Sequence, residues 1–119
     1  MNVLGIPDVL DAAADEILVR GHCKNVLISG DGKVCLGGAI YTALDPELKS
    51  QFNAAMSRHS YQVNAILAKV DAYFERTHSN IPTGNGQGHV SVRYNNRPDT
   101  TAGDVIELLR GTAKELRNA

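Results

Sequence analysis

The chain has 119 residues, a formal net charge of −1 and only two cysteines. This length accommodates one domain whose core needs no disulfide staples, so a single domain over residues 1–119 is predicted. The near balance of 12 basic and 13 acidic side chains gives no overall attraction to nucleic acid or anionic membranes, and no apolar run approaches the roughly 18 residues of a membrane span.

The first predicted helix begins at Pro7 and ends at Gly21, with apolar residues on one stripe and acidic residues on the opposite face. The residues before it lack both the cationic leader and the long apolar core of a signal peptide. We therefore predict a cytoplasmic protein, in which Cys23 and Cys35 are thiols most of the time.

Residues 25–44 are the stretch around which the other elements are expected to pack. A short apolar run, an Asp31-Gly32 turn and the pair Val34-Cys35 predict a β-hairpin, because a tight primed turn needs a positive φ that glycine adopts without steric cost. From Leu36 the apolar residues recur at helical spacing. The hairpin is therefore predicted to run directly into a helix that ends near Leu44.

The triplet Asp45-Pro46-Glu47 predicts the start of a long helical region, with an N-cap acceptor, a proline at the first helical position and an acid in the first turn. One straight helix of about thirty residues would be about 45 Å long. A compact domain of this size has an expected radius of gyration of about 13 to 14 Å. We therefore predict a break near residues 57–60, and whether residues 46–77 form one helix or two stays open.

Residues 78–89 are predicted to form a flexible loop. Its glycine-rich part lacks the Lys-Ser or Lys-Thr of a phosphate-binding loop. After this loop, Val90, Val92 and Tyr94 alternate with polar residues, which predicts a short strand. Because a lone strand must pair, it is expected to join the hairpin.

The last helix is predicted to begin with a capping box formed by Thr101 and Asp104. Together these patterns predict an α+β fold that is mostly helical. Four to five helices would surround a small β-hairpin or three-stranded sheet.

Two cysteines and a histidine are the candidates for chemistry. Cys35 lies at a predicted helix start, where the helix dipole lowers a thiol pKa, and His22 is a candidate base, so both are candidate catalytic residues. The alternative for Cys35 is a small buried hydrophobe. His22, Cys23 and Cys35 are also candidate zinc ligands, although their spacing lacks a paired CxxC or HxxxH and a fourth donor. No cofactor is predicted, and an enzyme is less favoured than a binding protein.

Five basic side chains near the C-terminus are candidates for nucleic-acid binding, with Tyr94 as a stacking surface. They are Arg93, Arg97, Arg110, Lys114 and Arg117. Glu107 and Glu115 interrupt this series, and no DNA-binding or RNA-binding signature is present. Nucleic acid is therefore a less favoured partner than protein.

Three aromatic residues of the central helical region, Tyr61, Tyr73 and Phe74, are the candidates for an interaction surface. Their apolar face is suited to binding another protein or to self-association of the chain. No membrane partner is predicted.

Two segments carry a motif resemblance. Residues 20–40 contain Arg-Gly-His-Cys and then Asp-Gly-Lys-Val-Cys-Leu-Gly-Gly-Ala-Ile, and residues 94–110 contain Tyr-Asn-Asn and then Thr-Ala-Gly-Asp-Val-Ile-Glu-Leu-Leu-Arg. Together they resemble a family of small, functionally uncharacterised proteins found in actinobacteria and their bacteriophages. The resemblance covers the two ends of the chain and leaves residues 46–88 unaccounted for.

This chain departs from the family pattern at two places. The family has an aromatic residue, commonly Trp, followed by Asn-Asp where this chain has Tyr94-Asn95-Asn96, and another aromatic residue often stands where this chain has His22. The missing acid at Asn96 argues against a catalytic carboxylate there. The resemblance implies provenance and fold, and it brings no activity with it.

The leading prediction is a small accessory protein of an actinobacterium or its phage that binds a host or phage protein. The first alternative is an enzyme with a cleft near Cys35, His22 and the Asn95-Asn96 turn. The second is a nucleic-acid-binding protein that uses the C-terminal basic residues.

Overall fold

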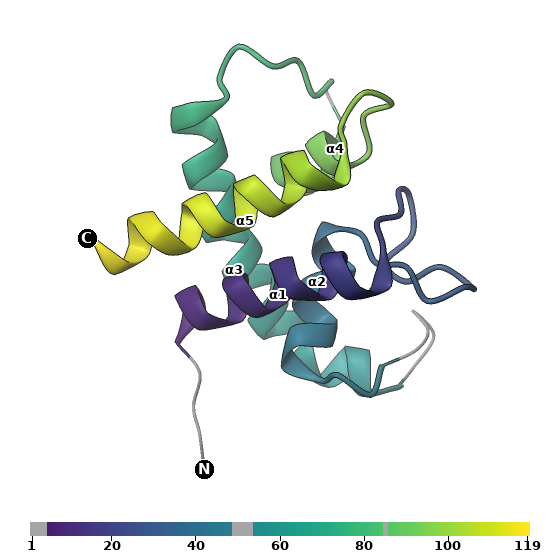
Figure 1. The fold of residues 1–119 in the computed structure, drawn as a ribbon. Coiled ribbons are helices and arrows are strands. Elements are labelled where there is room, and N and C mark those ends of the chain that lie inside the picture. The colour runs from purple at the N-terminus through teal and green to yellow at the C-terminus, as the bar shows by residue number, and fades with distance from the viewer. Residues whose placement is uncertain (1–4, 49–53, 85) are drawn as a thin grey trace.

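The computed structural model describes residues 5–48, 54–84 and 86–119, and this part of the chain has an all-α fold (Figure 1). The helices are α1 (Ile6–Arg20), α2 (Leu36–Leu44), α3 (Ala54–Thr77), α4 (Val90–Asn95) and α5 (Ala102–Arg117). Helices α1 and α5 lie side by side and antiparallel, and α3 crosses behind them (Figure 1). Among the described residues, no helix combines the length and the apolar character needed to span a membrane.

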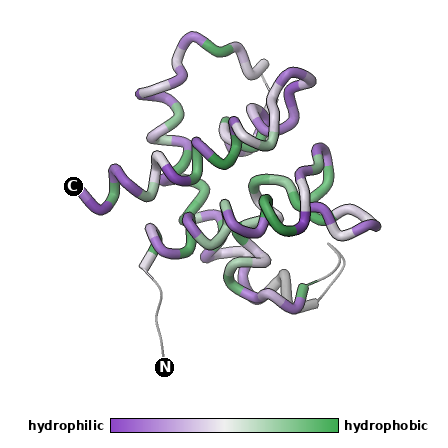
Figure 2. Tube along the Cα trace, viewed as in Figure 1, coloured by the Kyte–Doolittle hydropathy of each residue, from purple (hydrophilic) through white to green (hydrophobic). Residues whose placement is uncertain are grey.

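The core lies where α1, α2, α3 and α5 meet. Hydrophobic positions gather at this crossing, whereas the C-terminal end of α5 is hydrophilic (Figure 2). The largest side chains that are almost fully buried come from all four helices and from the connection after α2. They are Leu10, Ile17, Leu36, Ile40, Leu48, Ile66, Leu108 and Leu109.

The predicted β-hairpin is wrong, although its turn is present. Gly32 has a φ of 89°, and the backbone N–H of Ser29 donates to the carbonyl of Lys33 at 2.8 Å. Beyond the turn, Val34 makes only two isolated bridges, an antiparallel one with Ile28 and a parallel one with His22. Because Val34 is held between two different segments, neither side extends into a ladder.

The predicted strand at residues 90–94 is also wrong, because these residues form helix α4. The buried residues of α4 are Ser91, Tyr94 and Asn95, which lie on one helical face. Ser91 and Asn95 are polar and are buried through hydrogen bonds to other segments. The alternation of Val90 and Val92 therefore resembles a strand, because the face of α4 that is actually buried is mostly polar and has no apolar period. The α+β class is corrected to all-α for the described residues.

The predicted break near residues 57–60 is absent, since α3 runs continuously from Ala54 to Thr77. Its 24 residues correspond to about 36 Å, which equals the longest extent of the molecule, 36 Å, while the radius of gyration is 13.1 Å. One uninterrupted helix of this length therefore fits the expected compactness.

The predicted helix start at residues 45–47 is a turn in the structure. The guanidinium group of Arg20 donates to the carbonyls of Pro46 and Leu48 at 2.7 and 3.0 Å. A helix beginning at Pro46 would need these carbonyls for its own hydrogen bonds. Arg20 therefore occupies the acceptors of that first turn. Phe52, which the helical spacing of apolar residues after residue 46 predicts on the inner face of this region, lies outside the described residues.

The ends of three helices are confirmed. Pro7 lies in the first turn of α1 and Gly21 caps its C-terminus with a φ of 95°. Helix α2 begins at Leu36, and its N-cap is Cys35. Helix α5 has the predicted capping box, in which Thr101 and Asp104 exchange side-chain-to-backbone hydrogen bonds.

Candidate functional site

The side-chain amide of Asn95 ties α4 to the segment between α1 and α2. Asn95 is fully buried; its Oδ1 accepts from the backbone N–H of Leu36 at 3.1 Å and lies 2.7 Å from Nε2 of His22. Its Nδ2 donates to the carbonyl of Cys23 at 3.3 Å and to Oδ1 of Asn96 at 3.0 Å. Because Oδ1 can only accept, the hydrogen bond places a proton on Nε2 of His22. We call these five residues the Asn95 cluster.

Cys35, the candidate nucleophile, lies beside this cluster as a buried N-cap of α2. Its Sγ accepts from the backbone N–H of Gly38 at 3.4 Å, and the residue is 3% exposed. Burial raises the pKa of the Cys35 thiol to about 11. A reactive cysteine needs the opposite shift, toward the thiolate. Within the described part of the chain, the Cys35 sulfur forms no hydrogen bond with a histidine ring, and the His22 Nε2 is directed to Asn95.

Cys23, a candidate metal ligand, is surrounded by backbone carbonyls. Its Sγ lies 3.4 Å from the carbonyl oxygens of Val26 and Lys33, to which the thiol can donate. Burial raises its pKa, so the thiol form is favoured. In the residues that the structure describes, no three His, Cys, Asp or Glu side chains are placed to hold one metal ion. The candidates His22, Cys23 and Cys35 therefore do not converge on a common point.

A small pocket does lie at the predicted cleft. It has a volume of about 180 Å³ and is lined by residues 25–27, Cys35, Val92 and Asn96. The backbone N–H of Asn25 donates to Oδ1 of Asn96 at 2.9 Å and closes one side. Apart from the two asparagine side chains, the lining is mostly apolar, and the volume is below the roughly 300 Å³ at which ligand pockets usually begin.

Two of the basic candidates, Arg110 and Arg117 of α5, are paired with the acidic face of α1. Arg110 lies 2.8 Å from Asp15 and 3.6 Å from Asp11, and Arg117 lies 2.8 Å from Asp8 and 2.6 Å from Asp11. These carboxylates neutralise both guanidinium groups. A nucleic-acid phosphate would have to compete with them for the same donors.

The other basic candidates are dispersed. Arg93 donates to the carbonyl of Gly88 at 2.8 Å, and Arg97 forms two hydrogen bonds with Asp99 at 3.1 and 3.0 Å. Both residues belong to α4 and the segment directly after it. Lys114 is exposed near the other end of α5. Arg110, Lys114 and Arg117 share one face of α5 by their spacing of four and three residues. Arg93 and Arg97 come from α4 and the segment after it, so no single element carries all five.

The three aromatic candidates differ in exposure. Phe74 is buried at 2% exposure, and the hydroxyl of the partly buried Tyr73 lies against Gly111 of α5. Tyr61 is 89% exposed, more than any other large hydrophobic residue of the described chain. Only Tyr61 of the three is therefore available on the surface.

A carboxylate of α3 holds the start of α4. Asp71 Oδ1 accepts from the N–H and the hydroxyl of Ser91 at 2.9 and 2.6 Å, and its Oδ2 lies 2.5 Å from Nδ1 of His89. Aspartate, histidine and serine are the residue types of a hydrolytic triad. In such a triad the serine hydroxyl donates to the histidine, whereas here it donates to the aspartate. Ser91 is also fully buried. This arrangement caps α4. It was missed because Asp71 lies 18 positions from His89 and 20 positions from Ser91 in the sequence.

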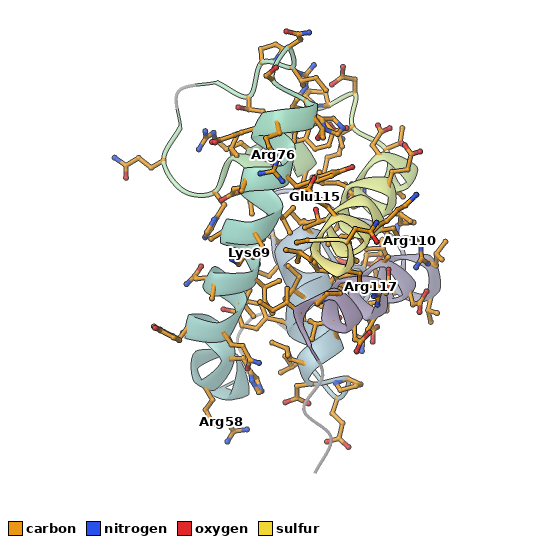
Figure 3. The ribbon with its side chains drawn as sticks, turned by 90° about the vertical axis from the view of Figure 1, so that its left-hand side faces the viewer. Arg58, Lys69, Arg76, Arg110, Glu115 and Arg117 are labelled. Atoms are coloured by element: carbon orange, nitrogen blue, oxygen red, sulfur yellow. The ribbon has the colours of Figure 1, made fainter. Side chains whose placement is uncertain are left out.

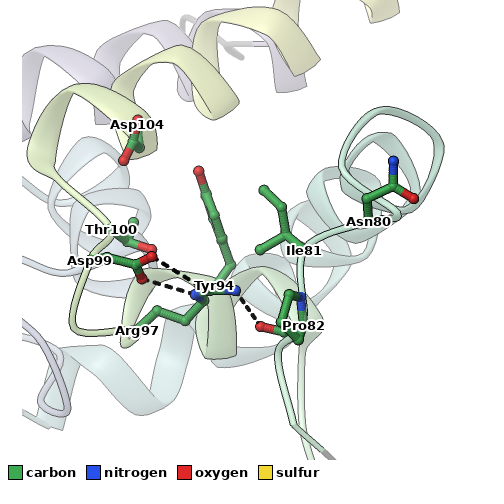
Figure 4. A pocket seen from close by; sticks show the side chains of 8 residues that line it. All are labelled: Asn80, Ile81, Pro82, Tyr94, Arg97, Asp99, Thr100 and Asp104. Carbon is green, nitrogen blue, oxygen red and sulfur yellow. Dashed lines mark hydrogen bonds and ion pairs between the residues drawn. The ribbon is translucent and has the colours of Figure 1, made fainter.

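A larger pocket, which sequence reasoning also missed, lies between α4, the start of α5 and the loop before α4 (Figure 4). It has a volume of about 310 Å³ and is lined by residues 80–82, Tyr94, three residues of segment 97–100, and Asp104. The Tyr94 ring forms its base and contacts Phe74 and His78, with ring centroids 4.9 and 5.7 Å away. The alternation of apolar residues that suggested a strand had assigned Tyr94 only to a sheet face.

Comparison with known proteins gives a family and no activity. The model of DUF6197, described as a family of unknown function, matches residues 1–115. No curated protein and no solved structure matches the chain.

Proposed function

We propose that this chain, which belongs to the DUF6197 family of unknown function, acts by binding another protein. We further propose, from the motif resemblance of residues 20–40 and 94–110, that it is an accessory protein of an actinobacterium or its phage. The observation that carries the binding proposal is the outer face of α3.

The outer face of α3 carries an exposed stripe of one aromatic and three small residues. Tyr61 is 89% exposed, and Ala65, Ala68 and Ala72 lie further along on the same side, all exposed. The intervals of four, three and four residues keep these positions in line along a helix. Because alanine projects little, a second helix can approach this stripe closely, with Tyr61 as its largest contact. We call these four residues the α3 stripe.

One edge of the α3 stripe is basic. Arg58, Lys69 and Arg76 are exposed and separated by about three and two helical turns, which places them in a line. Figure 3 shows Lys69 between Arg58 and Arg76 along α3, with Arg76 next to Glu115 of α5. Within the described residues, Arg58 and Lys69 form no ion pair. A partner helix with carboxylates beside its apolar residues would complement this edge.

The same edge disfavours the self-association alternative in one arrangement. In an antiparallel pair of α3 helices related by a twofold axis, each edge of the stripe lies against the same edge of the second copy. The basic edge of one copy, Arg58, Lys69 and Arg76, would then lie opposite the basic edge of the other copy in reversed order, and like charges opposite one another are destabilising. An acidic partner is therefore favoured over a second copy.

The test is capture of partners from an actinobacterial lysate treated with nuclease, and then affinity measurements with the purified partner. We expect Tyr61→Ala and Lys69→Glu each to weaken binding about tenfold or more, as central interface residues do. The matched controls are Val19→Ala, an exposed apolar residue of α1 at 85% exposure, and Lys114→Glu of α5. All four positions are exposed, so the melting temperature should change little.

Three results would overturn the proposal. Capture that disappears with nuclease would identify nucleic acid as the partner. A dimer of the purified chain that dissociates in Tyr61→Ala would identify self-association. Equal loss of binding in the Tyr61 and Val19 variants, or no purified partner that binds directly, would remove the α3 stripe as the docking surface.

A further inference from the structure

The 310 Å³ pocket beside Tyr94 presents a tyrosine hydroxyl that no protein group hydrogen-bonds. Tyr94 is only 7% exposed, and its hydroxyl points into the pocket (Figure 4). Among the described residues, this hydroxyl has no hydrogen-bond partner, and it is open to the pocket, since the one fully buried side-chain nitrogen or oxygen without a partner is Nε of Arg93. A ligand that offers a hydrogen-bond donor would satisfy it.

The charges around this hydroxyl are predominantly negative. Asp104 and Asp99 line the pocket with a single opposing charge, Arg97. Burial, followed by the negative charge of Asp104, raises the pKa of Tyr94, so the hydroxyl is neutral at physiological pH and keeps its lone pairs for accepting. Among the residues that line the pocket, carboxylates therefore outnumber basic groups by one. The ammonium group of Lys24, which donates to the carbonyl of Arg97, adds a positive charge beside Asp99 and not beside Tyr94.

The one basic residue is already used internally. Arg97 donates through Nε and one terminal nitrogen to Asp99, and through the other terminal nitrogen to the carbonyl of Pro82 at 2.5 Å. The positive N-terminus of α5 is matched by its own capping box, in which Asp104 Oδ2 accepts from the N–H of Thr101 at 2.9 Å. The hydrogen-bond donors that an anionic ligand would need at this pocket are thus already occupied. Asp104 Oδ1, by contrast, has no hydrogen-bond partner in the described residues.

The remaining surface is apolar and aromatic. Ile81 and Pro82 face the Tyr94 ring across the pocket (Figure 4). An aromatic face attracts a cation, and the attraction is stronger where water is partly excluded. We propose that this pocket binds an organic ammonium group carried on a short apolar chain, held by Asp104, the Tyr94 hydroxyl and the Tyr94 ring.

Two sources supply this chemistry: a lysine side chain of a partner protein, or a free alkylamine. They differ at the far end of the apolar chain, where a lysine joins a polypeptide backbone and a simple alkylamine ends. Two of the lining residues, Asn80 and Asp99, are exposed, so the pocket is reached from solvent. Either source of the ammonium group can therefore enter it.

The test is titration of the ¹⁵N-labelled full chain with n-butylammonium chloride, monitored by amide chemical shifts. We expect saturable shifts at Ile81, Tyr94 and Thr100, with much smaller ones for n-butanol and for sodium butyrate. Tyr94→Phe, which keeps the ring, and Asp104→Asn, which keeps the capping acceptor, should each weaken binding about five- to tenfold. Glu75→Gln removes an exposed carboxylate of α3 and should leave affinity unchanged.

Nα-acetyl-lysine N-methylamide separates the two sources. Affinity equal to or above that of butylammonium identifies a protein lysine as the ligand, and weaker binding identifies a free amine; both outcomes support an ammonium site. Butyrate or butanol binding as well as butylammonium, unchanged affinity in both variants, or no saturable shift up to about 100 mM, beyond which affinity is negligible, would overturn the proposal.

Discussion

The carbonyl oxygen of Leu27 occupies the space that a side chain at Gly38 would need. A Cβ atom at position 38 would lie 1.8 Å from this oxygen and 2.7 Å from its carbon. The first turn of α2 therefore packs directly on the backbone of the segment before it. Since backbone atoms cannot rotate away, Gly38→Ala should lower the free energy of unfolding by at least about 3 kcal/mol.

Gly37→Ala is the matched control, because the nearest atom to its Cβ is a side-chain carbon of Leu27 at 3.1 Å. That side chain can shift, and alanine favours the helix by up to about 1 kcal/mol over glycine. Urea unfolding should therefore show a large loss for Gly38→Ala and little change for Gly37→Ala. Similar losses in both would contradict the close backbone contact.

Replacement of Asn95 should lower the free energy of unfolding through the loss of its hydrogen bonds, even where the volume of the side chain is kept. Asn95→Leu keeps the volume but leaves the N–H of Leu36 and the carbonyl of Cys23 without their partner, which should cost about 2 to 4 kcal/mol. Asn80→Ala, at an exposed asparagine, should stay within about 0.5 kcal/mol of the parent. Chemical unfolding measures both, and a small loss for Asn95→Leu would show that the cluster contributes little.

Cys35 should make stability fall at alkaline pH. Burial raises the pKa of its thiol from 9.0 to about 11, so between these values the unfolded chain binds fewer protons than the folded one. The free energy of unfolding contributed by this group is then complete below pH 9 and is lost as pH rises toward 11, by about 2 kcal/mol.

Cys35→Ser isolates this effect, because serine keeps a capping oxygen and does not titrate in this range. Burial also raises the pKa of Tyr41 and Tyr94, but these residues are present in both proteins. The variant should have a lower free energy of unfolding than the parent protein at pH 7. This difference in the free energy of unfolding should shrink between about pH 9 and 10.5. A deficit that is constant with pH would contradict a buried, protonated thiol.

The ion pairs between α1 and α5 should contribute little and depend on salt. Asp11 bridges Arg110 and Arg117, but all of these side chains are partly or largely exposed. Asp11→Asn should lower the melting temperature by about 2 °C or less, and the difference should vanish near about 1 M NaCl. A loss that persists at high salt would indicate that Asp11 acts through packing.

The sequence predicted those features of the fold in which all interacting residues lie within one turn of each other. Thr101 and Asp104 specify their capping box within one turn, and Gly32 specifies its turn by its positive φ. The errors occurred where a distant group decides the outcome. Arg20 takes the carbonyls at residues 46 and 48, and Asp71 holds the start of α4. Neither partner lies near in sequence, so a local pattern cannot contain this information.

The candidate site was partly predictable for the same reason. His22, Cys35 and the Asn95-Asn96 turn do lie in one region, where the enzyme alternative had grouped them, but the hydrogen bonds of Asn95 give the region a structural role. The basic residues could be counted, whereas their pairing with α1 depends on how two helices pack. The Tyr94 pocket requires three segments at once and left no trace in the sequence.

The Asn95 cluster also constrains when this protein can fold. Its hydrogen bonds join positions 59 to 73 residues apart, so the N-terminal segment lacks its partners until α4 is present. Such long-range contacts require loop closure before they contribute, which slows folding. During synthesis, the hydrogen bonds from Asn95 to residues 22, 23 and 36 can form only after Asn95 has left the ribosome, so a chain that stops short of it keeps the local turn of residues 29–33 but lacks the tie to α4.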